Sequence, residues 1–144
     1  MWLEAPNEER VMDFAEVIAK WRDETIDAAD EILQVITFKI GQSVVMLSPV
    51  DTGRFRGNWQ LTIGRGSDMS LMREDQSGAS TLSEMSSTIR SLSIGQVAYI
   101  QNHVLYGFDL EHGSSPQARD PDGMVMVTAA KFNQIVQAAI AQVV

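Results

Sequence analysis

The sequence predicts an α+β fold with a long N-terminal helix, a small antiparallel or mixed sheet of short strands, a short middle helix and a C-terminal helix. Two patterns indicate this fold. Apolar residues recur at three- and four-residue steps near both ends of the chain, whereas a stretch in between alternates with a period of two. The 144 residues, 44% hydrophobic and 21% charged, suit one domain with its own core. We expect a single domain over residues 1–144, with an acidic helical extension at 1–24 and an α+β core at 25–144.

The first predicted helix lies within residues 8–47. Asn7 is a suitable N-cap, and Pro49 prevents the helix from continuing. Its apolar stripe consists of Val11, Phe14, Ile18, Trp21, Ala29, Ile32, Ile36, Ile40, Val44 and Leu47.

An unbroken helix of this length would measure ~60 Å at ~1.5 Å per residue, whereas a compact domain of this size is only ~35–40 Å across. Either the helix breaks near residues 23–27, where Thr25 interrupts the stripe, or one end projects. In the second case another subunit has to cover Trp21. Both alternatives stay open at this stage.

The middle of the chain alternates between short elements and loops. Residues 54–63 read as a strand with one apolar and one wet face: Phe55, Trp59, Leu61 and Ile63 on the first, and Arg56, Asn58, Gln60 and Thr62 on the second. Residues 64–80 form a long loop, of the kind that is functional or mobile. A short helix capped by Thr81 or Ser83 then runs to Leu92, followed by a strand at 97–100. Residues 105–110 are a strand or a helical turn.

The end of the chain contains a second loop and one more helix. The loop spans residues 113–123, and the helix runs from Met124 or Thr128 to Val143. Its predicted apolar face consists of Phe132, Ile135, Val136, Ala139 and Val143.

Charge and composition narrow the classes of function. Nineteen acids against 11 bases give a net charge of −8, and residues 1–31 alone hold ten acids against three bases. This balance argues against a free-standing nucleic-acid binder. There is no cysteine, no apolar run long enough to span a bilayer and no signal-peptide pattern at the N-terminus. We therefore expect a cytoplasmic chain without membrane contact.

No set of residues predicts catalysis or a cofactor. His103 and His112 are the only histidines, and with Asp109 and Glu111 they suggest a divalent-metal site only weakly, because adjacent Glu111 and His112 point apart. Our expectation is no catalytic residue, no metal and no cofactor. The alternative is a small metal-dependent nuclease or hydrolase that uses Asp109, Glu111 and His112.

Two segments carry a resemblance to a known family. The first is S-P-V-D-T-G-R-F-R-G-N-W at 48–59, and the second comprises Tyr106 and L-E-H-G-S at 110–114. With Val97-Ala98-Tyr99 between them and a loop leading to a last helix, this order resembles small tail-completion or neck proteins of long-tailed bacteriophages, over residues 25–143. The chain departs from the family's Pro-Phe start of the last helix, since it has Pro116-Gln117-Ala118 and then Gly123-Met124-Val125-Met126.

The resemblance implies a virion protein of the neck or tail, assembled in the host bacterial cytoplasm as a ring of six or twelve copies. It would join head-connector proteins to tail-tube or tail-terminator proteins, and DNA would pass through without specific binding. The residues of the family's turn are Pro49, Asp51, Thr52, Gly53 and Gly113. Expected contacts with neighbouring subunits or partners are Trp21, Arg54, Arg56, Trp59, Arg65, Glu111 and His112.

The turn and its arginines give two expectations. Gly53 is expected at positive φ, where a β-branched residue is disfavoured. Charge reversal at Arg54 or Arg56 is expected to spare the monomer and weaken assembly. A third class of function is also open: a cytoplasmic interaction module unrelated to phages, whose acidic helix docks onto a basic partner.

Overall fold

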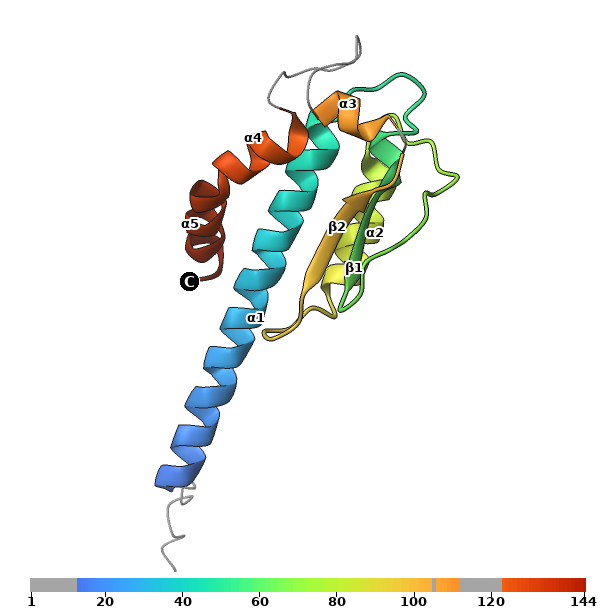
Figure 1. Ribbon diagram of the computed structural model, residues 1–144. Helices are drawn as coiled ribbons and strands as arrows, with labels where there is room; N and C mark the ends of the chain where they lie inside the picture. The colour runs from blue at the N-terminus through green and yellow to red at the C-terminus, as the bar shows by residue number, and fades with distance from the viewer. Residues whose placement is uncertain (1–12, 105, 112–122) are drawn as a thin grey trace, which may run out of the picture.

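The computed structural model describes residues 13–104, 106–111 and 123–144. It has the predicted α+β fold (Figure 1): a long helix α1 (Phe14–Leu47) with a two-stranded antiparallel sheet and α2 on one side, and two C-terminal helices on the other. The sheet consists of β1 (Trp59–Ile63) and β2 (Ala98–Asn102), with Trp59 opposite Asn102 and Ile63 opposite Ala98.

Helix α1 is continuous, so of the two alternatives the break at residues 23–27 is wrong and the projecting end is confirmed. Thr25 is helical like its neighbours, and its hydroxyl donates back to the carbonyl of Trp21 within the same helix (2.7 Å). The helix starts with a capping box in which Asp13 and Glu16 bond each other's backbone N–H groups. Asp13 is therefore the N-cap of α1, and the expected cap, Asn7, lies outside the described residues.

Only the C-terminal part of α1 is packed against the rest of the molecule. Buried residues on α1 begin at Thr37, and Asp30 and Gln34 bond the backbone at Ile94 and Leu92. Residues 14–27, which we call the arm, project beyond the sheet and the C-terminal helices (Figure 1). At ~1.5 Å per residue the arm measures ~21 Å.

The core lies where α1, α2 and the sheet meet. It contains Val44, Val45, Phe55, Trp59, Leu61, Met85, Ile89, Val104, Leu110 and Met124. Helix α2 (Ala79–Ile89) contributes Met85 and Ile89, and it begins after Gly78 rather than at the expected caps Thr81 or Ser83. Thr81 lies in the first turn of the helix and is fully buried.

Two further predictions need correction. The first strand starts at Trp59 rather than at Arg54, because residues Arg56–Asn58 form the 3₁₀-helix η1. The single C-terminal helix is in fact two, α4 (Met124–Ala130) and α5 (Phe132–Val143), whose axes differ by 61°. In the described part of the chain no single helix could cross a membrane; only this bent pair, taken together, has sufficient length and apolar character.

Candidate functional site

The site is built on the turn that follows α1. The helix stops at Leu47, Ser48 takes an extended conformation before Pro49, and Gly53 has φ +90°, as predicted. The carbonyl of Gly53 accepts hydrogen bonds from the N–H groups of Gly57 (2.8 Å) and Asp75 (2.9 Å). A Cβ atom at Gly53 would lie 2.5 Å from the backbone nitrogen of Gln76, so any side chain here would push the two segments apart.

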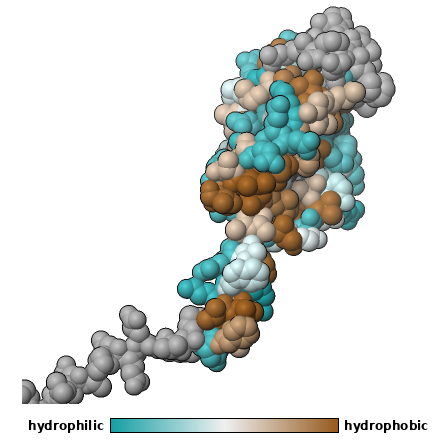
Figure 2. All heavy atoms as spheres, turned by 90° about the vertical axis from the view of Figure 1, so that its left-hand side faces the viewer, coloured by the Kyte–Doolittle hydropathy of each residue, from teal (hydrophilic) through white to brown (hydrophobic). Residues whose placement is uncertain are grey.

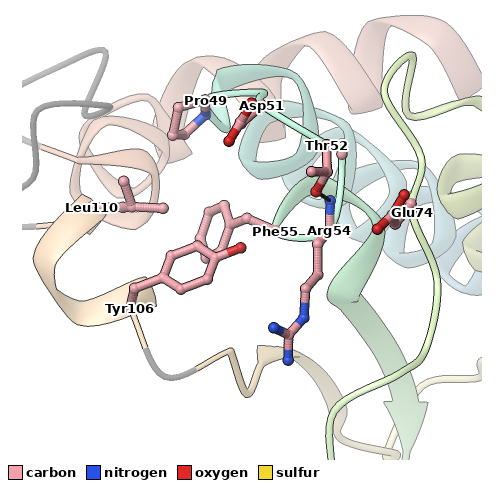
Figure 3. Close-up of a pocket in the computed structure, with 9 residues that line it drawn as sticks. Pro49, Asp51, Thr52, Arg54, Phe55, Glu74, Tyr106 and Leu110 are labelled. Atoms are coloured by element: carbon pink, nitrogen blue, oxygen red, sulfur yellow. Dashed lines mark hydrogen bonds between the residues drawn. The ribbon is translucent and has the colours of Figure 1, made fainter.

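A hollow of about 470 Å³ separates this turn from α3 (Gly107–Glu111). Its lining residues are Pro49, Asp51, Thr52, Gly53, Arg54, Phe55, Glu74, Tyr106 and Leu110. Tyr106 and Leu110 face Phe55 and Pro49 across the hollow (Figure 3), and the rings of Tyr106 and Phe55 are 6.0 Å apart. The structure thus brings together the two sequence segments that carry the family resemblance.

The hollow has an apolar floor and a charged rim. Phe55 is buried and packs edge-on against Trp59, with ring centroids 5.8 Å apart. Asp51, Arg54 and Glu74 are exposed and contribute both signs of charge. Such a surface suits recognition of another protein, since it combines an aromatic anchor with a polar rim.

Arg56 is not a surface residue, and its expected role as a contact to another subunit is wrong. It is only 8% exposed. Its guanidinium donates to the carbonyls of Met46 (3.2 Å) and Ser48 (3.0 Å) at the end of α1, and to the carbonyl of Gln76 (2.8 Å). Arg56 therefore satisfies carbonyls at the negative end of the α1 dipole and ties the 71–78 segment to that helix.

Trp59 and Glu111 also act within the subunit. Trp59 is 5% exposed, and its indole Nε1–H donates to the Ser48 hydroxyl (2.7 Å), so the expected intersubunit contact at Trp59 is wrong as well. Both carboxylate oxygens of Glu111 accept hydrogen bonds from the first N–H groups of α4, at Met124, Val125 and Met126 (2.8–2.9 Å). Its carboxylate is therefore occupied in capping α4.

Arg54, Arg65 and Trp21 are exposed, and Trp21 keeps 64% of its surface accessible. Intersubunit or partner contacts at these three residues stay predictions. His112 and Gly113 lie outside the described residues, as does most of the expected loop at 113–123.

The segment at 64–78 is held by contacts from its own chain rather than by a partner. The Asn58 amide is fully buried; it accepts from the N–H of Leu71 (2.6 Å) and donates to the carbonyls of Arg54 and Arg73. Arg73 donates to the carbonyl of Gly57 (2.7 Å) and pairs with Glu84 of α2. These contacts tie the segment to η1, to the turn after α1 and to α2.

Asp75 is the central acceptor of this segment. Its carboxylate accepts from the backbone N–H and hydroxyl of Thr81 (both 2.8 Å), and from the N–H of Gly78 (3.1 Å). Burial raises the pKa of Asp75, but the hydrogen bonds from Thr81, Gly78 and Ser77 outweigh burial and hold the pKa below its ordinary value. Asp75 thus supplies the side-chain cap that Gly78 lacks.

Sequence reasoning missed Asn58, Arg73 and Asp75. Asp75 escaped notice because it lies three residues before the N-cap Gly78 rather than at the cap position, where an acid is the usual signal. Asn58 and Arg73 bond backbone groups 13 to 16 residues away, which no local pattern reveals.

Within the described residues, no three histidine or acidic side chains gather in a way that could hold a metal ion. His103 Nε2 lies 3.1 Å from the Ser67 hydroxyl. The side chain of Asp109, named for the hydrolase alternative, is outside the description together with His112.

No protein-family model matches the chain. Searches of curated proteins and of solved structures likewise find no match.

Proposed function

We propose that this protein is a structural subunit of a bacteriophage neck or tail, which assembles with copies of itself into a ring between head and tail. The observation that carries the proposal is the arm. Phe14 and Trp21 are 81% and 64% exposed on a helix that no other described part of the chain covers. Large apolar side chains in such a position mark an interaction site.

The hollow, which lies at the C-terminal end of α1, is a second candidate contact surface and supports the same function. The two segments that resemble the phage family, separated by 47 residues from Trp59 to Tyr106, meet around it. Its rim offers Asp51, Arg54 and Glu74 to a partner. A ring needs two different surfaces on each subunit, and arm and hollow are separate surfaces. Assembly would take place in the host cytoplasm, with connector and tail-tube or terminator proteins as neighbours and DNA passing through the channel.

Electron microscopy of phage particles labelled with an antibody against this chain tests the proposal. We expect label at the junction of head and tail, and rings of six or twelve copies in the purified protein. Particles that lack the protein but still carry joined, infectious heads and tails would refute it.

A further inference from the structure

The arm carries one continuous apolar stripe. Phe14, Val17, Ile18 and Trp21 follow the three- and four-residue spacing of a single helix face, and each is 48% exposed or more. Figure 2 shows apolar surface on the projecting helix as well as on the body. Burying this stripe is favourable in proportion to the apolar area removed from water, so docking of the arm against another apolar surface would be stabilising.

A groove on the body offers an apolar floor of matching character. It encloses about 410 Å³ over α1, and its walls come from α2 and from the end of α5. Val35, Phe38 and Ile89 supply apolar surface. Lys39, Arg90 and Glu31 supply the charges, with polar side chains from Gln34, Gln42, Ser86 and Gln142. We call this the α2–α5 groove.

The arm cannot reach the groove of its own chain. Both lie on α1, which runs without a break from Phe14 to Leu47, and a continuous helix cannot fold back on itself. An arm that occupies this groove therefore comes from another molecule.

Charge favours a second copy as that occupant. The arm carries four acids against two bases, while the groove carries Lys39 and Arg90 against Glu31. Neither Lys39 nor Arg90 forms an ion pair with any described residue. Glu24 is three residues beyond Trp21, at the border of the stripe, and a docked arm would bring it towards these cations.

We propose that the arm of one copy docks in the α2–α5 groove of a second copy, with Trp21 as its anchor. The contact is heterologous, because it joins two different surfaces, and such contacts close into rings when the rotation between copies permits. The inference rests on the proposed function for the ring, but the contact itself can be tested separately.

Engineered cysteines test it directly, since the chain has none of its own. One preparation carries Thr25→Cys on the arm, and a second carries Ser86→Cys on the groove wall. After mixing and mild oxidation, we expect a disulfide between the two variants. Thr25→Cys mixed with Ser70→Cys, an exposed position in the 64–78 segment, is the matched control and should give little product.

Sizing by light scattering completes the test. Trp21→Ser should shift the oligomer towards monomer by at least tenfold in dissociation constant, without loss of helical signal. Arg90→Glu should weaken association, and salt should weaken association of the wild type.

Cross-linking of Thr25→Cys only to itself would overturn the inference in favour of arm–arm pairing. A protein that stays monomeric at all concentrations would overturn it in favour of a different partner. If rings form but Thr25→Cys and Ser86→Cys do not cross-link, the arm–groove contact is refuted and the neck function is unaffected. If the two variants cross-link but virions lack the protein, the contact is confirmed and the neck function is refuted.

Discussion

Replacing Arg56 by Met should destabilise the monomer strongly, although the sequence alone places this residue on a wet strand face. The substitution removes three hydrogen bonds, of 2.8, 3.0 and 3.2 Å, from a buried cation to carbonyls. Hydrogen bonds to charged groups contribute ~1.5–3 kcal/mol each, and a buried carbonyl left without a partner costs ~1–3 kcal/mol. The cation also opposes the negative end of α1, worth up to ~2 kcal/mol.

Relief of the charge's own desolvation offsets part of this loss, so we expect a net decrease of about 3–4 kcal/mol in the free energy of unfolding. At ~2–4 °C per kcal/mol for a chain of this size, Tm should fall by roughly 10 °C. Thermal and urea unfolding followed by circular dichroism measure both quantities.

The matched control is Arg54→Met, on the exposed side of the same turn. It should stay within ~0.5 kcal/mol of wild type, as surface substitutions usually do. Arg56→Glu should be worse than Arg56→Met, because it places a carboxylate against three carbonyls. If the two Met variants unfold at the same temperature, the internal role assigned to Arg56 is wrong.

Three further predictions concern the turn and the caps. Gly53→Ala should lower the free energy of unfolding in urea by several kcal/mol more than Gly64→Ala, because both glycines have positive φ but only Gly53 lies against backbone atoms. If the two variants lose the same stability, the close backbone approach at Gly53 has no effect of its own. The pKa of Asp75 is lowered in the folded state, so its contribution to stability is present above about pH 4 and is lost as pH falls through the lowered value. Asp75→Asn should therefore lower Tm at pH 7 and reduce the decrease in Tm between pH 5 and 2. If Tm of the variant depends on pH as that of the wild type does, this prediction is wrong. Glu111→Gln should weaken the cap on α4 by ~1 kcal/mol, visible as faster amide exchange at Met126, whereas unchanged exchange would rule out the cap.

The helices and strands could be predicted because their signals are local. Apolar periodicity located α1, and Pro49 and Ser48 fixed its end to within a residue. The unbroken course of α1 through residues 23–27 could not be predicted from the stripe. A threonine is compatible with a helix interior when its hydroxyl bonds back to the i−4 carbonyl, as Thr25 does to Trp21, and the Lys20–Glu24 pair adds support. The bend between α4 and α5 at Lys131 could not be predicted either, because no glycine or proline marks it in the sequence.

The assignment of Arg56 to the solvent-exposed face of a strand failed for a definite reason. Period two applies only to extended chain, whereas residues Arg56–Asn58 form a 3₁₀ turn that shifts the phase. As a result Arg54 points to solvent at the hollow and Arg56 points to the end of α1. Tertiary hydrogen bonds, not alternation, decide which of the two arginines is buried.

The turn motif therefore says more about architecture than about partners. Gly53, Arg56 and Trp59 within it bond or pack against the end of α1, the 71–78 segment and the core. Any chain with this fold requires these residues to join α1 to the core, whatever its function. The motif is therefore direct evidence for the fold, whereas its bearing on the phage role rests on the family resemblance alone. The residues free to specify a partner are the exposed ones, Arg54 at the rim of the hollow and Trp21 on the arm. It follows that substitutions which abolish assembly while leaving the unfolding free energy unchanged should fall at these exposed positions. Substitutions at the buried turn residues Gly53, Arg56 and Trp59 should lose both properties together.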